Sequence, residues 1–556
     1  MSKNKKKTAA PKQQAATIQT IEKTNRVEFI VVNILCLFIF LAFGYIGIMS
    51  FFETSVFDQT NIASEIVIFE GDNILLNLFF TALFIALLFW LRRFYDFFAK
   101  VNIQIMEIGL AVWAAIFGII WIYSVTSVPA ADSANLYEAA TNSANGDYSK
   151  FFDNSGFYFS EYYNGHNYFH FFPFQLGFVF FSEIVYRIFG TDSSMPVQVI
   201  NVLSLASAYF ALARITKLLF KRKSIEFIAI LLLAVCFQPI FLCTFVYGNV
   251  IGMSTAVWAS LFLIKYFRTN RWVWIIPAGC LLMLSTIVKY NNLIYLVAFV
   301  IMLILHAIKG KKWQSIAFAV AMCILCVGSS KLIIMSYEAR ANTQFESGLT
   351  QTMYFDLGLQ ESPMAPGWYT KTAVNDYMKG GYDTERGNAV AQASIDRRLE
   401  ELSDDMGYGF EFFGKKILSQ WNEPSYESIW ISQVKQHTEE MSDLAKDIYN
   451  NGFWGQCFAL HFNFYMQLLF VLFALGIYLL FIDRRTNIET VLLPLVLLGA
   501  FGYHLLFEAK SQYACTYIPL LVPTAAYAMN KVLFSDYTKV KKLVATVNKK
   551  IGKSNG

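Results

Sequence analysis

The sequence predicts an all-α polytopic membrane protein: about twelve transmembrane helices with juxtamembrane helices and an extracellular, mainly helical domain. Of its 556 residues, 56% are hydrophobic and only 15% are charged, whereas about 25% of a soluble domain is charged. Apolar runs of 17–25 residues recur along the chain. Because about 20 helical residues cross the hydrocarbon core of a bilayer, these runs indicate repeated membrane crossings.

Twelve apolar runs are interpreted as spans. They lie near 28–50, 73–91, 105–128, 196–216, 225–246, 250–267, 272–288, 291–308, 314–335, 457–481, 488–507 and 513–530. A further apolar run, 172–189, contains Glu183 and Arg187. We expect it to lie in the membrane interface with its charges toward water, because counting it as a span would invert every later loop.

Basic residues predict the orientation. Clusters precede 28–50 and follow 73–91, 196–216, 250–267, 291–308, 457–481 and 513–530. Under the positive-inside rule all of them are cytoplasmic. We therefore expect a basic cytoplasmic tail (1–27), a transmembrane region (28–335) with its first external loop at 129–195, an extracellular acidic domain (336–456), a second transmembrane region (457–530) and a second basic cytoplasmic tail (531–556).

The predicted extracellular domain is acidic. Its 121 residues contain nineteen Asp and Glu against ten Lys and Arg, in a chain whose net charge is +5. The periodicity of Asn388–Leu402 is typical of an amphipathic helix. The charge of this domain disfavours a polyanionic partner and favours a neutral or zwitterionic glycan, or a protein.

Asp132 is the leading candidate for a catalytic residue. It follows the span near 105–128 and precedes a predicted helix over 133–144. One interpretation is an N-cap, since Asp accepts hydrogen bonds from the first amides of a helix. The other is a general base held at the outer membrane surface, and both can be true of a rigidly placed carboxylate.

Three other segments are predicted to meet Asp132 outside the membrane. Pro173 should begin a helix whose free amides face a phosphate, or the aromatic run around it is an ordinary interfacial aromatic belt. Lys289 and Lys510 each lie where two spans meet, and both could bind phosphate oxygens or be an interfacial and a surface cation.

No metal site stands out. His166 and His170 have i,i+4 spacing but lack the glutamate of a zinc helix motif. Asp132 together with Asp147 or Asp153 could hold Mg²⁺ or Mn²⁺ through oxygen ligands. No cofactor is certain from the sequence.

These residues resemble a known family. The pattern Asp132…Tyr137…Gly146-Asp147 followed by Pro173-Phe-Gln175-Leu-Gly177 is similar to the first external loop of GT-C glycosyltransferases, especially bacterial relatives of protein O-mannosyltransferases and aminoarabinose transferases. Phe245-Val-Tyr247-Gly-Asn249, Lys289-Tyr-Asn291 and the late segment Glu508-Ala-Lys510-Ser-Gln512-Tyr513 extend the resemblance over most of 105–530. Ser133 and Gln512 depart from the family pattern, which has an acidic residue and often an arginine there.

The resemblance implies a GT-C-like bundle in a bacterial plasma membrane and a glycosyltransferase with an extracellular site. It would move a sugar from a polyprenyl-phosphate donor to a cell-envelope glycan, teichoic-acid-type polymer or protein, with no nucleic acid involved. Asp132 would be the catalytic base. The implied donor contacts are Lys289, Lys510, Gln512, Tyr513, Pro173 and Gln175, and the implied acceptor-binding or structural residues are Tyr137, Asp147, Glu508, Tyr247 and Asn249.

Two alternatives stay open. A lipid or glycolipid transporter would bury ionisable residues in mid-membrane, but the predicted spans are nearly free of them. A non-catalytic assembly partner that keeps the fold is favoured by Ser133 and Gln512.

Overall fold

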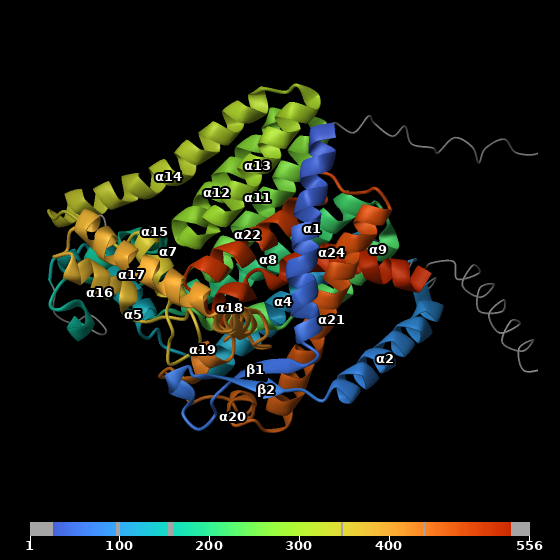
Figure 1. Ribbon diagram of the computed structural model, residues 1–556, viewed down its shortest axis with the longest axis horizontal. Helices are drawn as coiled ribbons and strands as arrows, with labels where there is room; N and C mark the ends of the chain where they lie inside the picture. Colours follow the sequence, from blue (N-terminus) through green and yellow to red (C-terminus); the bar gives the residue numbers. More distant parts are fainter. Residues whose placement is uncertain (1–25, 96–99, 154–159, 346–347, 438–439, 535–556) are drawn as a thin grey trace, which may run out of the picture.

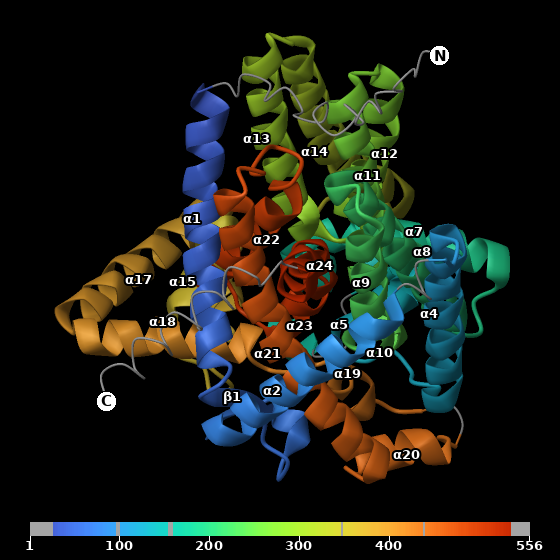
Figure 2. The same ribbon diagram turned by 90° about the vertical axis from the view of Figure 1, so that its right-hand side faces the viewer.

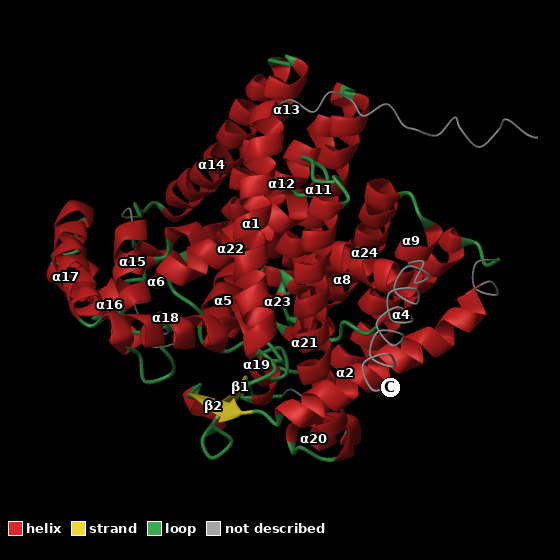
Figure 3. Cartoon of the chain, turned by 45° about the vertical axis from the view of Figure 1, so that its right-hand side comes forward, coloured by secondary structure: helices red, strands yellow, loops and turns green. Residues whose placement is uncertain are grey.

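The computed structural model describes residues 26–95, 100–153, 160–345, 348–437 and 440–534. In these ranges the chain is helical apart from loops and one two-stranded sheet (Figure 3). This confirms the predicted all-α polytopic class. The lysines of the two predicted basic tails, apart from Lys531, lie outside the described residues.

Every predicted span coincides with an apolar helix. Seven are long enough to cross a membrane: α1 (Arg26–Met49), α4 (Ile103–Val125), α8 (Met195–Phe220), α11 (Asn249–Thr269), α13 (Leu293–Gly310, with the turn before it), α14 (Gln314–Ala341) and α21 (Phe453–Ile482). An eighth is bent by 45° between α9 (Lys223–Ala234) and α10 (Gln238–Phe241) with η6 (Leu242–Thr244). The shorter apolar helices are α2 (Ile74–Leu91), α12 (Ile275–Val288), α22 (Leu492–Leu506) and α24 (Ile518–Phe534). The chain is a multi-pass membrane protein, while the count of twelve spans stays a prediction.

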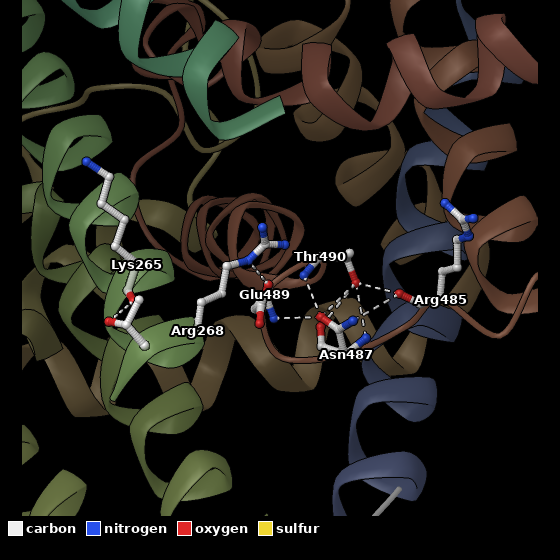
Figure 4. A network of polar contacts seen from close by, with 7 residues as sticks. Lys265, Arg268, Arg485, Asn487, Glu489 and Thr490 are labelled. Carbon is white, nitrogen blue, oxygen red and sulfur yellow. Dashed lines mark hydrogen bonds and ion pairs between the residues drawn. The ribbon is translucent and has the colours of Figure 1, made fainter. Parts of the chain in front are cut away.

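The bundle has two distinct ends (Figures 1 and 2). The start of α1 and the turn between α13 and α14 lie at one end, and the hairpin of β1 and β2 lies at the other with α20. Figure 4 shows part of the first end, where Arg268 at the close of α11 forms a 2.6 Å ion pair with Glu489. Asn487 accepts hydrogen bonds from the amides of Glu489 and Thr490 in the same loop. This network joins α11 to the loop between α21 and α22.

The opposite end is covered by a layer of short elements. The antiparallel hairpin pairs Glu53 of β1 (Glu53–Phe57) with Gly71 of β2 (Val67–Gly71). The helices of this layer are α5 (Asp132–Ala144), α6 (Tyr168–Phe171), α7 (Leu176–Phe189), α15 (Gln351–Leu359), α16 (Thr372–Lys379), α17 (Thr384–Asp404), α18 (Met406–Trp421), α19 (Trp430–Gln433), α20 (Asp443–Tyr449) and α23 (Ser511–Cys515). The predicted helix Asn388–Leu402 lies within α17.

The acidic segment 336–456 shares its core with the first loop. Leu136 and Phe171 of the loop pack in one buried cluster with Met353 and Tyr377 of the later segment. The hairpin is also tied in, because the Ser55 amide donates to the Asn422 carbonyl. Three segments far apart in sequence thus form one outer layer.

Helix α7 lies in this layer against α5 and α14. The expectation that both of its charges face water is wrong for Glu183, which is 4% exposed. Its carboxylate accepts hydrogen bonds from Arg340 (2.8 Å) and Arg187 (2.9 Å) and from the Tyr337 hydroxyl. A buried carboxylate needs such partners, and α14 extends past the predicted span to Ala341 to provide two of them.

Two glycines allow the chain to approach the end of α12 closely. A Cβ at Gly177 would lie 2.1 Å from the Ile287 carbonyl oxygen, and one at Gly248 would lie 2.2 Å from that of Val288. Gly248 also has a φ of +69°, which favours glycine. These contacts fix the backbone that leads into Lys289.

We predict that Gly177→Ala destabilises the folded protein. The added methyl would collide with backbone that cannot rotate away, and overpacking of this kind costs about 1–3 kcal/mol. Thermal unfolding in detergent measures the loss. Gly109→Ala is the matched control, since a Cβ there meets nothing within 4 Å; equal unfolding temperatures for both variants would contradict the prediction.

Candidate functional site

Asp132 is the first residue of α5, and Ala131 occupies the N-cap position with a φ of +51°. The interpretation of Asp132 as a helix cap is therefore wrong. The Ser133 hydroxyl closes this turn instead, because it donates to the Ala130 carbonyl at 2.7 Å and accepts from the Ala130 amide at 3.1 Å. The Asp132 carboxylate is left available for the interior of the outer layer.

The acidic segment holds the loop that delivers Asp132. The Val128 amide donates to the Gln436 carbonyl at 2.8 Å, and Ser127 pairs with His437 in an isolated β-bridge. His437 Nδ1 also lies 2.7 Å from the Val125 carbonyl oxygen at the end of α4. The position of the carboxylate therefore depends on a segment 300 residues later.

The surroundings of Asp132 perturb its acidity. Burial raises the pKa of its carboxyl above the ordinary value, and the charges of Lys510 and Lys289 and the neighbouring Tyr168 hydroxyl offset part of that rise. Tyr168 on α6 is itself fully buried. In its ionised form, a carboxylate with a raised pKa is a stronger base than a solvated one.

Lys289 lies between α12 and the turn η8 (Tyr290–Asn292). Its Nζ is 4.2 Å from the centre of the Tyr247 ring and 5.6 Å from that of Tyr513. No ion pair to it is found in the part of the chain that the structure describes. Burial lowers its pKa to about 7, against the opposing effect of Glu508 and Asp132. It is a cation near Asp132 without a bonded counter-ion.

Lys510 differs from Lys289 because it has two protein counter-ions. Its Nζ lies 2.8 Å from Glu65 and 3.5 Å from Glu427, and its side chain is only 11% exposed. Burial lowers its pKa, but Glu427 and Glu65 outweigh this and the net shift is upward. The geometry favours a structural role for Lys510 over the predicted phosphate contact, and over an exposed surface pair with Glu508.

The link between α22 and α23 contributes the other late residues. The Tyr513 hydroxyl donates to Glu508 at 3.1 Å, and the Glu508 carbonyl oxygen lies 2.8 Å from His504 Nδ1. Gln512 is buried, and its backbone amide donates to Glu427 at 3.2 Å. Tyr513 and Glu508 thus lie beside Lys289. The Gln512 backbone amide instead bonds to Glu427, which is one of the two counter-ions of Lys510.

The predicted residues of the middle helices also reach this region. Pro173 begins the turn η5 (Pro173–Gln175), which leads into α7 as predicted. Gln175 donates a hydrogen bond to the Tyr247 hydroxyl. Asn249 begins α11 and is 4% exposed; together with Lys289 and Tyr513 it lines a small cavity.

Two predicted residues lie away from Asp132. The Tyr137 hydroxyl donates to the Thr191 carbonyl at 3.1 Å, beyond the end of α7. Asp147 is exposed past the far end of α5, roughly 20 Å along the helix axis at 1.5 Å per residue. Its carboxylate accepts from the Ser149 amide at 2.9 Å, so the proposed joint cation site with Asp132 is not assembled.

The other metal candidates are also separated. His166 stacks on Tyr382 at 3.7 Å, whereas His170 lies against Phe345. Asp153 is exposed. Over the described ranges, no three His, Cys, Asp or Glu side chains come together as a metal site would require.

Lys435 was not predicted. Its Nζ lies 4.7 Å from the centre of the Phe245 ring, which stacks on Tyr247 at 5.0 Å. Burial lowers its pKa to about 7, and no counter-ion is bonded to it among the residues placed by the structure. No sequence signal marks it, because the acidic segment that carries it is 190 residues from Phe245.

Comparison with known proteins supports the expected resemblance for part of the chain. Residues 175–334 match the family model described as dolichyl-phosphate-mannose-protein mannosyltransferase. This confirms the GT-C resemblance over the segment that holds Gln175, Tyr247 and Lys289, while Asp132 and Lys510 lie outside it. No curated protein sequence matches the chain.

Solved structures show distant similarity. The archaeal oligosaccharyltransferase AglB from Archaeoglobus fulgidus, in complex with an inhibitory peptide and a dolichol-phosphate, is 16% identical with a TM-score of 0.40. The match covers 80% of this chain and 52% of AglB, so the chain spans about half the length of that relative. ArnT from Cupriavidus metallidurans, bound to undecaprenyl phosphate, is 11% identical with a TM-score of 0.31, covering 75% of this chain and 77% of ArnT.

The two lysines should differ in their effect on stability. We predict that Lys510→Met lowers the free energy of unfolding by about 3 kcal/mol or more, because it leaves Glu427 and Glu65 without their counter-ion. Lys289→Met removes an unpaired buried cation and should leave stability unchanged or improved. Thermal unfolding of the two variants in the same detergent compares them; a larger loss for Lys289→Met would contradict the assignment.

Proposed function

We propose that the protein transfers a sugar from a polyprenyl-phosphate donor to a hydroxyl of a cell-envelope acceptor at the outer face of the membrane. The observation that carries this proposal is the juxtaposition of Asp132, which has a raised pKa, with the unpaired cation Lys289. Both lie where the outer layer meets the helix ends. The partial family match is in accord with this chemistry.

Asp132 acts as the general base in this proposal. Its carboxylate accepts the proton of the acceptor hydroxyl while the acceptor oxygen attacks the anomeric carbon of the sugar. The bond between that carbon and the phosphate oxygen breaks, and the polyprenyl phosphate leaves with the electron pair. The proton stays on Asp132 until solvent removes it.

Lys289 stabilises the leaving phosphate. A leaving phosphate needs preorganised positive charge rather than protonation, and an ammonium group is an effective point charge for phosphate. Lys289 is held over Tyr247, so little reorganisation is needed when the donor arrives. The positive end of the α7 dipole, which begins just after Gln175, is a second source of positive potential.

The charge distribution supports an outer position for the site. Lys221, Lys309 and Arg268 lie in turns that the positive-inside rule assigns to the cytoplasm. Asp132 and Lys289 lie at the opposite ends of the neighbouring helices. The donor lipid would therefore be used at the extracellular leaflet, with both chain termini inside.

We predict that Asp132→Asn reduces sugar transfer from a labelled polyprenyl-phosphate donor by about 10²–10⁴-fold, the usual contribution of a general base. Asp147→Asn is the matched control, because Asp147 is exposed past the other end of the same helix. Full activity in Asp132→Asn would remove Asp132 as the base. No transfer by the wild-type protein with any donor would favour a transporter or a non-catalytic partner.

We also predict a bell-shaped pH profile of kcat/KM for the donor. Activity should fall as pH drops below the raised pKa of Asp132, because the base becomes protonated. It should fall again as pH rises through about 7, because Lys289 loses its proton. Lys289→Arg should abolish the alkaline limb, since a guanidinium stays charged. Lys435→Arg is the control, and its pH profile should keep the alkaline limb. If Lys289→Arg also keeps this limb, Lys289 is not the group whose deprotonation causes it.

A further inference from the structure

A second polar pocket lies in the outer layer between α15, α16 and α17. Its volume is about 600 Å³. Besides small residues, its lining consists of polar and charged side chains: Asp356, Gln360, Thr372, Asn375, Asp376, Lys379, Ser394 and Arg397. None of them belongs to the site around Asp132.

Two buried carboxylates meet on the inner wall of this pocket. Asp356 is fully buried and Asp376 is 3% exposed. One oxygen of each, Oδ2, has no hydrogen-bond donor among the described residues, although Gln360 donates to Asp356 Oδ1 at 2.6 Å. Two adjacent carboxylates repel each other when both are ionised. Burial, the charge of Asp356 and a hydrogen bond to Asp356 raise the pKa of Asp376 to about 7, while the charge of Lys379 acts in the opposite direction. A bound cationic group would relieve this repulsion.

Two cations lie at the mouth of the same pocket. Lys379 and Arg397 are exposed, and no ion pair to either is found in the part of the chain that is described. They can bind an oxyanion without breaking an existing contact. The pocket thus has negative charge at its inner wall and positive charge at its mouth. This arrangement fits a ligand that carries both an ammonium and an acidic group.

The size of the pocket argues against a bare metal ion. A cation such as Ca²⁺ needs 6–8 oxygen ligands within about 2.6 Å, and the described chain gathers no third acidic or histidine ligand here. A volume of about 600 Å³ is in the range of small-molecule sites. The remaining lining groups, Thr372, Asn375 and Ser394, can bond to hydroxyls of such a ligand.

We propose that this pocket binds a zwitterionic group, with its ammonium between Asp356 and Asp376 and its phosphate or carboxylate at Lys379 and Arg397. We assign this group to the acceptor, and this assignment rests on the proposed function. Helix α15 connects the two sites: Tyr354 lies near Glu508 and Tyr247, and Asp356 follows two residues later, about 200° around the helix. Occupation of the pocket would therefore hold part of the acceptor near, but outside, the reacting centre.

Isothermal titration of the full-length protein in detergent tests this proposal with four probes: O-phosphoethanolamine, ethanolamine, inorganic phosphate and CaCl₂. We expect O-phosphoethanolamine to bind about ten-fold or more tightly than either half alone, since a charge-assisted hydrogen bond contributes about 1.5–3 kcal/mol, or a factor of ten or more. Asp376→Asn and Lys379→Gln should each weaken it about ten-fold. Asp404→Asn, exposed at the end of α17, is the control and should leave binding unchanged.

Lys379→Gln keeps the test informative if Asp376→Asn fails to fold, because Lys379 is exposed. Binding of CaCl₂ alone, no binding of any probe, or equal binding by wild type and Lys379→Gln would each overturn the proposal. Asp132→Asn should bind O-phosphoethanolamine as the wild type does. This arm separates the two proposals, since transfer can fail in Asp132→Asn while the pocket still binds.

Discussion

The ion cluster of Lys510 with Glu65 and Glu427 joins two segments of the outer layer, the hairpin and the acidic segment, to the late turn before α23. Glu65 lies in the hairpin, Glu427 in the acidic segment and Lys510 in the turn between two late helices. A buried pair of this kind adds little net stability but is costly to break, so it fixes how these segments fit together. The Ser511 hydroxyl and the Gln512 amide bond to the same glutamate. The late turn is thus set in place beside the region that holds Asp132 and Lys289.

The buried cations differ in whether they have a bonded counter-ion. Lys510 is neutralised by two carboxylates, whereas Lys289 and Lys435 contact aromatic rings. An aromatic face stabilises a cation only modestly, so these two ammonium groups keep most of their capacity to bind an anion. The absence of an arginine at Gln512 is therefore less serious than the sequence suggests, because Lys289 keeps an unpaired ammonium group beside Tyr247.

The transmembrane part of the fold was predictable from the sequence, and the outer layer only partly so. Apolar runs located the candidate membrane helices of the described residues because hydrophobicity is a local property of the chain. Asp132, Lys289, Tyr247 and Glu508 were also found, since each is a polar residue at a helix end. The ion partners of Lys510, the approach of Lys435 and the pocket of Asp356 and Asp376 were missed. They depend on side-chain contacts between segments that no periodic pattern connects, and Glu183 was misplaced for the same reason.

In the proposed mechanism, Lys289 and Asp132 face one another across a bound donor. A structure of the protein with a polyprenyl phosphate, determined by electron cryo-microscopy in lipid nanodiscs, tests it most directly. We expect the phosphate within hydrogen-bonding distance of Lys289 Nζ, with the Asp132 carboxylate on the acceptor side and the ion pairs of Lys510 with Glu65 and Glu427 intact. A phosphate bound at Lys510 in place of Glu427, or at the opposite end of the bundle, would contradict it.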